Sequence, residues 1–253
     1  MVAPYTPAEL MVARAAREIR DGEVVFVGMR LPLLAFLLAR STHAPGAVGV
    51  FETGVLRDTP AEAPLITMSD PPNLQGARMC MGMETVMGLL QAGRVALGFI
   101  GGAEVDRFGN LNTTRVSEGD RVARLPGSGG ACDIACLARR LVIVMKHERR
   151  RFVERVGYVT SPGHGEGAGW REARGLPGGG PSRVITDKGV FGFDPRTREM
   201  VLESAHPGVT GAAVRALTGW NLAVPPGLPA TAEPTPEELA AIRRFDPDGF
   251  WTG

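Results

Sequence analysis

Glu52 is the residue whose surroundings first suggest chemistry. It follows the apolar residues Val48, Val50 and Phe51, and Gly54 comes two positions later. β-Branched and aromatic residues followed by glycine predict a buried strand that ends in a turn, with the carboxylate at its carboxyl end. In open α/β sheets, ligands bind in the crevice outside these strand ends. On this stretch alone, a structural glutamate that pairs with an arginine or caps a helix is the simpler interpretation.

A second candidate is the glycine segment Gly127-Ser128-Gly129-Gly130, which precedes a predicted helix beginning at Ala131. The N–H groups at a helix start can bind an anion, or the oxyanion that forms when a carbonyl is attacked. The segment is not a dinucleotide-binding loop, because Cys132 stands where that pattern requires glycine. It also lacks the Gly-Lys-Ser/Thr ending of a nucleotide P-loop. A plain structural turn is the alternative.

A third candidate combines Gly101-Gly102-Ala103 with the turn residue Asn110, both close to the end of an apolar run at 95–100. This stretch, which continues to Asn112, could form a second edge of an active site at a strand's end. The alternative is a bulged turn in which the Asp and Asn side chains bond the local backbone.

Other reactive residue types lack a functional spacing. The charged run His147–Arg151 has no metal-ligand spacing and predicts a solvated strand exit. Cys132 and Cys136 lie four residues apart on a predicted helix, which indicates a packing face rather than metal or redox chemistry. His206 precedes a proline and is predicted in a turn. No Ser/His/Asp or Cys/His constellation stands out, and no metal site is predicted.

The composition excludes several classes of protein. The 253 residues are 44% hydrophobic and 22% charged, which is ordinary for a globular protein. Lys and Arg number 28 against 27 Asp and Glu, so no basic excess indicates nucleic-acid binding. No apolar run approaches the roughly 18 residues of a membrane span, and the start does not resemble a signal peptide. Three cysteines do not indicate a disulfide framework, so we expect a cytoplasmic protein.

The order of elements predicts an α/β fold. Two Thr-Pro-x-Glu capping boxes, at Thr6 and Thr235, begin the first and last predicted helices. Short connections between alternating helices and strands predict a single open, mainly parallel sheet covered by helices on both faces. An antiparallel extension is expected around 156–204, and residues 57–78 are expected to be irregular. No linker separates two domains, so one domain over 1–253 is predicted. Predicted helices are 7–19, 32–39, 79–90, 131–140, 211–217 and 236–244; predicted strands are 24–27, 48–51, 95–100, 141–145, 156–160, 184–186, 189–193 and 200–204.

Several blocks in fixed order resemble the β subunits of family I CoA-transferases, most closely those of glutaconate CoA-transferases. The likeness runs from Tyr5 to about Asp246, nearly the whole chain. The blocks are Val50–Gly54, Phe99–Asp106, Phe108–Asn112, Gly127–Ala131, Lys146–Phe152, Val159–Gly163, Arg174–Gly178 and Val184–Gly189.

This resemblance implies that Glu52 is the nucleophile of a ping-pong reaction. Its carboxylate would attack an acyl-CoA, and the CoA thiolate would then convert the mixed anhydride to a glutamyl-CoA thioester. Coenzyme A would be a substrate and covalent intermediate, with no permanently bound cofactor. The backbone amides of Gly130 and Ala131 would stabilise the oxyanion. The substrate-binding residues implied are Thr53, Gly54, Gly101, Gly102, Ala103, Asn110, Gly127, Ser128 and Gly129.

The resemblance also implies that the chain is half of an enzyme. An α subunit would complete the active site in an α2β2 or α4β4 assembly, and the acids would be a glutaconate-like dicarboxylate or a 3-oxo acid. Thr53 stands where relatives often carry Ser or Asn, and it keeps a hydroxyl. The Gly163–Gly180 loop differs in detail from relatives, so the choice between these acids is not predicted. Two alternatives are a non-catalytic subunit that binds acyl-CoA or a partner, and a ring-opening acyl-CoA hydrolase of the same fold.

Overall fold

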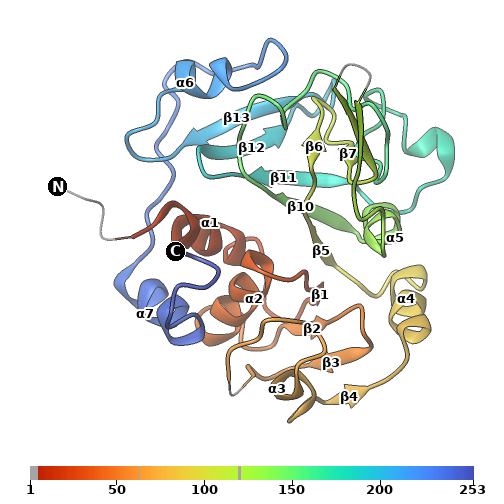
Figure 1. Cartoon of the computed structure of the whole chain (residues 1–253), viewed down its shortest axis with the longest axis vertical. Helices are drawn as coiled ribbons and strands as arrows, with labels where there is room; N and C mark the ends of the chain where they lie inside the picture. The colour runs from red at the N-terminus through yellow and green to blue at the C-terminus, as the bar shows by residue number, and fades with distance from the viewer. Residues whose placement is uncertain (1–4, 62, 119–120) are drawn as a thin grey trace. The chain divides into compact units, whose positions relative to one another are not determined.

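A computed structural model describes residues 5–61, 63–118 and 121–253 (Figure 1). The chain divides into two compact units. The first combines the residues up to Phe99 with Ala232–Gly253, and the second is Ile100–Thr231. The first unit is therefore discontinuous in sequence, whereas the second is a single stretch. One domain over 1–253 stays a prediction.

The first unit is built from helices around a small mixed sheet. Strand β1 pairs in parallel with β2 and with β5, and the antiparallel strands β3 and β4 follow beyond β2. Its helices are α1 (Pro7–Ala16), α2 (Leu31–Ser41), α3 (Pro71–Leu74), α4 (Met83–Gln91) and α7 (Pro236–Phe245). Its strands are β1 (Val24–Phe26), β2 (Val48–Val50), β3 (Val55–Arg57), β4 (Met79–Cys80) and β5 (Leu97–Ile100).

Both predicted capping boxes are confirmed. The Thr6 hydroxyl accepts from the Glu9 N–H at 3.1 Å, and the Glu9 carboxylate accepts from the Thr6 N–H at 2.8 Å. Thr235 and Glu238 repeat this arrangement at the start of α7, with the same two distances of 3.1 and 2.8 Å. Each box satisfies N–H groups that the first helical turn leaves without a partner.

The two capping glutamates also join the ends of the first unit. Arg243 near the end of α7 donates to Glu9 at 2.7 Å, and Arg17 after α1 donates to Glu238 at 2.7 Å. Each carboxylate therefore caps its own helix and binds an arginine from the other end of the chain. Both glutamates are buried, so these ion pairs are less screened by solvent than ordinary surface pairs.

The position of β2 is set by Phe36 of α2. A side chain on Gly49 would lie 2.6 Å from the Phe36 ring, so the helix can approach the strand only over a glycine. Phe36 also contacts Phe51 edge-on, with ring centroids 6.5 Å apart. Both rings are fully buried. Helix α2 therefore packs against β2 just before Glu52.

The prediction of a helix from residue 79 was wrong. Residues 79 and 80 form β4, and α4 begins only at Met83. The N–H groups of Arg78 and Met81 donate to Leu56 and Gly54 at 3.0 and 2.9 Å, so the backbone pairs with β3 instead of forming a helical turn.

The second unit contains strands β10 to β13 in the order β13-β12-β11-β10. β10 and β11 are parallel, whereas β11, β12 and β13 are antiparallel. Its helices are α5 (Ala131–Leu137), η1 (Glu172–Arg174) and α6 (Gly211–Ala216). Its strands are β6 (Glu104–Val105), β7 (Leu111–Asn112), β8 (Arg115–Glu118), β9 (Arg121–Arg124), β10 (Arg140–Val144), β11 (Pro181–Ile185), β12 (Gly189–Phe193) and β13 (Met200–Ala205).

The α/β class and the antiparallel extension are confirmed in this unit. The hairpin of β11 and β12 and the third strand β13 lie where the sequence predicts them. Residues 156–160 form no strand, so the extension begins later than expected. The hairpin of β8 and β9 was not predicted, because its exposed strands carry too few apolar residues to show a periodic pattern. In the described part of the chain, no helix combines the length and apolar character that crossing a bilayer requires.

The glycine-rich loop between 163 and 180 is organised by the buried Arg171. Its guanidinium donates to Gly178 at 2.8 Å, to Gly163 at 2.9 Å and to Cys136 at 3.1 Å, all at carbonyl oxygens. It also reaches the Ala135 carbonyl of α5 at 3.0 Å. Burial lowers the pKa of Arg171. One side chain therefore fixes both ends of the loop and ties them to the last turn of α5.

We expect Arg171→Lys to destabilise the chain by about 3 kcal/mol, because an ammonium cannot reach these carbonyls at once and some would stay buried without a donor. Urea unfolding of the purified chain measures this loss. Arg155→Lys is the matched control, since Arg155 is exposed and pairs only with the exposed Glu166 at 3.3 Å among the described residues. Equal stability of the two variants would contradict this role for Arg171.

Histidines are buried in the second unit. His147 was predicted in a solvated strand exit, but it is buried and stacks on Phe152 with centroids 3.8 Å apart. His164 is buried as well, and its Nε2 lies 2.9 Å from the Pro181 carbonyl. Burial lowers the pKa of both His147 and His164 from 6.5 to about 4. Both rings are therefore neutral in the folded protein at pH 7.

The free energy of unfolding should fall as pH drops from about 6.5 to about 4. In this pH range the two histidines bind protons in the unfolded chain but stay neutral in the folded protein. Each of them should therefore lower the free energy of unfolding by about 1 kcal/mol at pH 5.5. Urea unfolding at pH 7.5 and 5.5 measures the effect. His164→Gln keeps a donor for the Pro181 carbonyl but has no imidazole to protonate. Between pH 7.5 and 5.5, its free energy of unfolding should fall by about 1 kcal/mol less than that of the wild type. An unchanged pH dependence in the variant would refute the assignment.

Candidate active site

Glu52 lies at the tip of a tight hairpin turn between β2 and β3. The Phe51 N–H donates to Val55 at 2.8 Å, and the Gly54 N–H donates back to Phe51 at 2.9 Å. Glu52 and Thr53 occupy the two middle positions of this turn. Glu52 is half-buried and Thr53 is exposed, so the turn presents its side chains at the surface of the first unit. The predicted buried strand that ends in a turn at Glu52 is confirmed.

Gly54 makes this turn possible. Its φ of +103° lies in a region that side chains disfavour, and a Cβ there would stand 1.7 Å from the Met81 carbonyl oxygen. The Gly54 carbonyl in turn accepts the Met81 N–H at 2.9 Å. The backbone of Met81, just after β4, therefore packs directly against the backbone of the turn and forms a hydrogen bond with it.

Arg57 supports the same hairpin from within. Its side chain is only 2% exposed, and its guanidinium donates to the Asn73 carbonyl at 2.7 Å and the Pro72 carbonyl at 2.8 Å. It further binds the carbonyls of Thr59, Pro60 and Gln75. The irregular region after β3 is thus folded around this residue. The sequence analysis missed it, although an arginine at the end of the apolar run Val55-Leu56 was a visible signal.

The glycine segments predicted as site edges meet in the second unit. Ala103 donates to Asn112 at 3.0 Å, and Gly127 donates to Thr113 at 2.8 Å. The Thr113 hydroxyl donates to the Gly127 carbonyl, also at 2.8 Å. Gly101–Ala103 and Gly127–Ala131 therefore bind the same stretch of chain after β7. Gly102 allows this approach, since a Cβ there would lie 2.7 Å from Leu111.

The segment from Gly127 to Ala131 forms the start of α5. Gly127 and Gly129 have φ values of +95° and +49°. The Ser128 hydroxyl accepts from the Cys132 N–H at 3.2 Å, and the Ser128 carbonyl accepts from the Ala131 N–H at 3.0 Å. An oxyanion would therefore share the Ala131 N–H with Ser128.

The side chain of Asn110 forms its hydrogen bonds within the chain. Its amide donates to both oxygens of Asp106, at 3.1 and 3.0 Å, and its oxygen accepts from the Gly163 and Gly165 N–H groups. Asp106 also accepts from the Phe108 N–H at 3.0 Å, and burial raises its pKa. This is the bulged turn that the sequence allowed as an alternative. The contacts favour a structural role for Asn110 over ligand binding.

Each unit holds a separate set of the predicted residues. Glu52, Thr53 and Gly54 belong to the first unit, and the two glycine segments belong to the second. The described residues contain no group of three or more His, Cys, Asp or Glu placed to hold a metal ion. Burial raises the pKa of the Cys136 thiol to about 11, so it is neutral at pH 7, which agrees with the predicted packing role.

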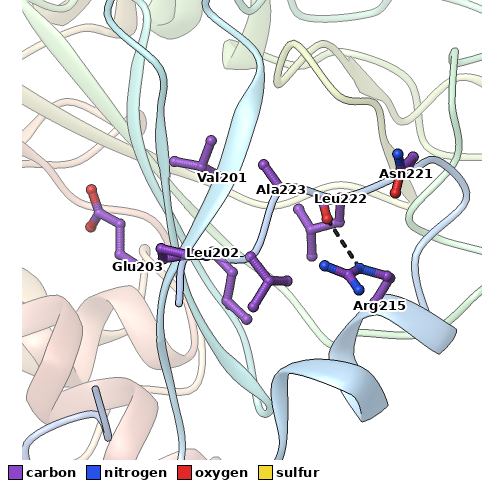
Figure 2. Close-up of a pocket in the computed structure, with 9 residues that line it drawn as sticks. Val201, Leu202, Glu203, Arg215, Asn221, Leu222 and Ala223 are labelled. Atoms are coloured by element: carbon purple, nitrogen blue, oxygen red, sulfur yellow. Dashed lines mark hydrogen bonds between the residues drawn. The ribbon is translucent and has the colours of Figure 1, made fainter. Parts of the chain in front are cut away.

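Cavities of the second unit lie outside the predicted residues. One of about 630 Å³ is bounded by β13, α6 and the segment 221–225, where Arg215 donates to the Leu222 carbonyl at 3.2 Å (Figure 2). A smaller one of about 250 Å³ is lined by Thr114, Arg115, Val122, Arg124 and Tyr158. None of the predicted site residues lines either cavity.

The sequence matches the coenzyme A transferase family model over residues 8–217. The chain belongs to the coenzyme A transferase family. It is 39% identical to the B subunit of 3-oxoadipate CoA-transferase from Pseudomonas knackmussii, covering 96% of this chain and 94% of that protein. It is 37% identical to the B subunit of glutaconate CoA-transferase from Acidaminococcus fermentans, covering 96% and 93%. The resemblance found in the sequence is thereby confirmed.

The fold agrees with a solved structure of the same family. Glutaconate coenzyme A-transferase of Acidaminococcus fermentans superposes with a TM-score of 0.89 and 33% identity, covering 99% of this chain and 98% of that one. A relative with another reaction is the cholesterol ring-cleaving hydrolase IpdB subunit of Mycobacterium tuberculosis. It is 30% identical, covering 94% of this chain and 93% of that protein. The relatives therefore include both transferases and a hydrolase.

Gly54→Ala should destabilise the chain by roughly 3 kcal/mol, because the added Cβ both overlaps the Met81 oxygen and strains the turn. Gly93→Ala is the control: Gly93 also has a positive φ, of +65°, but nothing lies within 4 Å of a Cβ there. This control should lose only about 1 kcal/mol. Urea unfolding compares the two variants. Equal losses of unfolding free energy would show that the positive φ of Gly54, and not its contact with Met81, accounts for the whole effect.

Proposed function

We propose that this chain is the β subunit of a CoA-transferase in which Glu52 is the nucleophile. The observation that carries the proposal is the tight turn between β2 and β3, which presents a half-buried carboxylate in a chain of this family. A carboxylate nucleophile is already an anion, so it needs no general base to remove a proton before it attacks.

The reaction has two steps in each direction. A carboxylate oxygen of Glu52 attacks the thioester carbonyl of an acyl-CoA, and the C–S bond breaks to give a mixed anhydride and CoA thiolate. The thiolate then attacks the glutamyl carbonyl, which forms an enzyme thioester and releases the first acid as its carboxylate. A second acid reverses both steps and leaves with CoA. No proton is gained or lost overall.

The second unit is proposed to stabilise the charge that develops in these steps. Backbone amides of Gly130 and Ala131 would donate to the tetrahedral oxyanion, each with about 3 kcal/mol when correctly aimed. Gly101–Ala103 and Gly127–Gly129 would line the path of the thioester, since glycines let a ligand approach the backbone closely. Thr53 and Gly54 would contact the substrate beside the nucleophile. Asn110 would position the loop rather than touch the substrate.

We propose that an α subunit completes the site in an α2β2 or α4β4 assembly. The support is that both transferase relatives are named as B subunits, with at least 93% of their lengths covered. Their names also support a 3-oxo acid or a glutaconate-like dicarboxylate as substrate. The loop anchored by Arg171 is our candidate for selecting between these acids.

A hydrolase is the second candidate, because the ring-cleaving IpdB subunit is a relative. A hydrolase would pass the acyl group or a cleaved carbon to water, so it needs no glutamyl-CoA thioester. A subunit that only binds acyl-CoA would form no thioester either. Trapping of the intermediate therefore separates the transferase from the other two functions.

The trap uses the chain purified in complex with its proposed α subunit. The complex is incubated with acyl-CoA and no acceptor acid, and borohydride then reduces any glutamyl thioester to a primary alcohol with release of CoA. Peptide mass spectrometry should find the reduced side chain at Glu52. Transferase activity with an unmodified Glu52 would overturn the assignment, and hydrolysis of the acyl-CoA without transfer of CoA to an acid would favour the hydrolase.

Glu52→Gln should lower kcat by roughly 10⁴-fold or more, because the amide is a poor nucleophile. Steady-state transfer between two acids measures the loss. The exposed Glu237→Gln removes the same charge elsewhere on the first unit and should leave kcat unchanged. A small effect of the Glu52 change would exclude covalent catalysis through this residue.

A further inference from the structure

Arg30 has a backbone conformation that is typical of glycine. It is the last residue of the loop between β1 and α2, with φ +67° and ψ −129°. A residue with a side chain and positive φ normally has ψ near +30° to +60°, and Arg30 lies far from that region. Arg198 also has a positive φ, of +64°, but it belongs to the hairpin turn between β12 and β13, where such a residue is common. Strained positions like Arg30 cluster at active sites and ligand clamps.

The loop that carries Arg30 starts beside the turn that carries Glu52. β1 and β2 are neighbouring parallel strands (Figure 1), and the Val27 N–H donates to the Val50 carbonyl at 2.9 Å. Such strands lie about 4.8 Å apart. Arg30 is three residues beyond Val27, which is at most about 11 Å of extended chain. Arg30 and Glu52 therefore lie at one edge of the sheet of the first unit, on loops that leave adjacent strands.

An aromatic ring holds the guanidinium of Arg30, which remains exposed. Its central carbon lies over the Trp251 ring, 5.5 Å from the centroid. Trp251 is fixed in turn, because its indole N–H donates to the Leu65 carbonyl at 3.2 Å and its backbone N–H to the buried Asp246 at 3.0 Å. Among the described residues, no ion pair involves Arg30. Stacking uses the face of the guanidinium and leaves the N–H groups at its edge, in the fork that matches a carboxylate.

The segment that begins at Leu65 connects this guanidinium with the turn of Glu52. The Thr53 hydroxyl lies 3.5 Å from the Met68 carbonyl, so the segment passes beside the turn. Ile66, between the two contacts, is 58% exposed, which is high for a large apolar side chain. The order of groups is therefore a carboxylate, an apolar surface and a cation. An acid with a hydrocarbon chain between two carboxyl groups is complementary to this order.

We propose that Arg30 selects dicarboxylic acids by binding the carboxylate that does not react. One carboxyl group of the acid forms the anhydride with Glu52, and the other accepts N–H groups from the Arg30 guanidinium. A monocarboxylic acid of the same length lacks this contact. The inference rests on the proposed function, because it takes Glu52 as the reacting carboxylate. Arg30 contacts the substrate far from the reacting atoms, so it determines which acid binds and leaves the covalent steps unchanged.

The test compares acids with and without the second carboxylate. In the assembled αβ enzyme, Arg30→Gly should raise the KM for glutarate as acceptor at least tenfold and leave kcat unchanged, because a charge-assisted contact is lost. The KM for pentanoate, the monocarboxylate of the same length, should be unchanged. Calorimetry without CoA should show at least tenfold weaker binding of glutarate to the variant. Glycine adopts this φ without strain, so the variant should unfold at no lower urea concentration than the wild type.

Arg198→Gly is the matched control, since it also removes an arginine at positive φ, but from the second unit. It should keep the wild-type KM for both acids. An unchanged preference for glutarate over pentanoate in Arg30→Gly would overturn the inference, and would be the result if the guanidinium paired instead with Glu62, which lies outside the described residues. Failure of the Glu52 trap with intact, Arg30-dependent binding of glutarate would refute the covalent mechanism alone.

Discussion

The contact between Gly54 and Met81 is the constraint on which the candidate site depends. Two backbone segments meet there with no room for a single carbon atom, since a Cβ on Gly54 would fall 1.7 Å from the Met81 oxygen. Glycine at this position lets the backbone of Met81 pack directly against the turn between β2 and β3. Arg57 of β3 ties the hairpin to the irregular region that follows by donating to its carbonyls. These contacts fix the backbone that carries Glu52, which favours its proposed role, because a pre-positioned nucleophile loses less entropy on the way to the transition state.

In the second unit too, side-chain hydrogen bonds to backbone groups hold an irregular segment in place. Arg171 satisfies the carbonyls of the glycine-rich loop, and Asn110 satisfies its N–H groups. The loop needs both because glycines cannot hold it by side-chain packing. Hydrogen bonds from these two buried side chains therefore hold a loop that has few side chains to pack.

Much of the fold could be predicted because it follows from local rules. Capping boxes at Thr6 and Thr235 mark helix starts through contacts within four residues, and the apolar runs of β1, β2 and β5 are unambiguous. Residues 79–82 were wrongly predicted as helical because their N–H groups pair with a strand some twenty-five positions earlier, which no local pattern reveals. The burial of His147 was missed for the same reason, since Phe191 and Thr218, which contact its ring, lie more than forty residues further along the chain. Glu52 could be placed at a strand end from its neighbours, whereas its proposed chemistry came from the family resemblance.

The ion pairs that join α1 and α7 have a consequence for the order in which the chain is made. Arg17 and Glu9 find their partners in Ala232–Gly253, so the first unit cannot form these contacts until that segment has been synthesised. The second unit ends at Thr231 and has all of its own residues before then. During synthesis, the unit that holds the two glycine segments therefore has its residues first, and the unit that carries Glu52 is closed only when α7 is made.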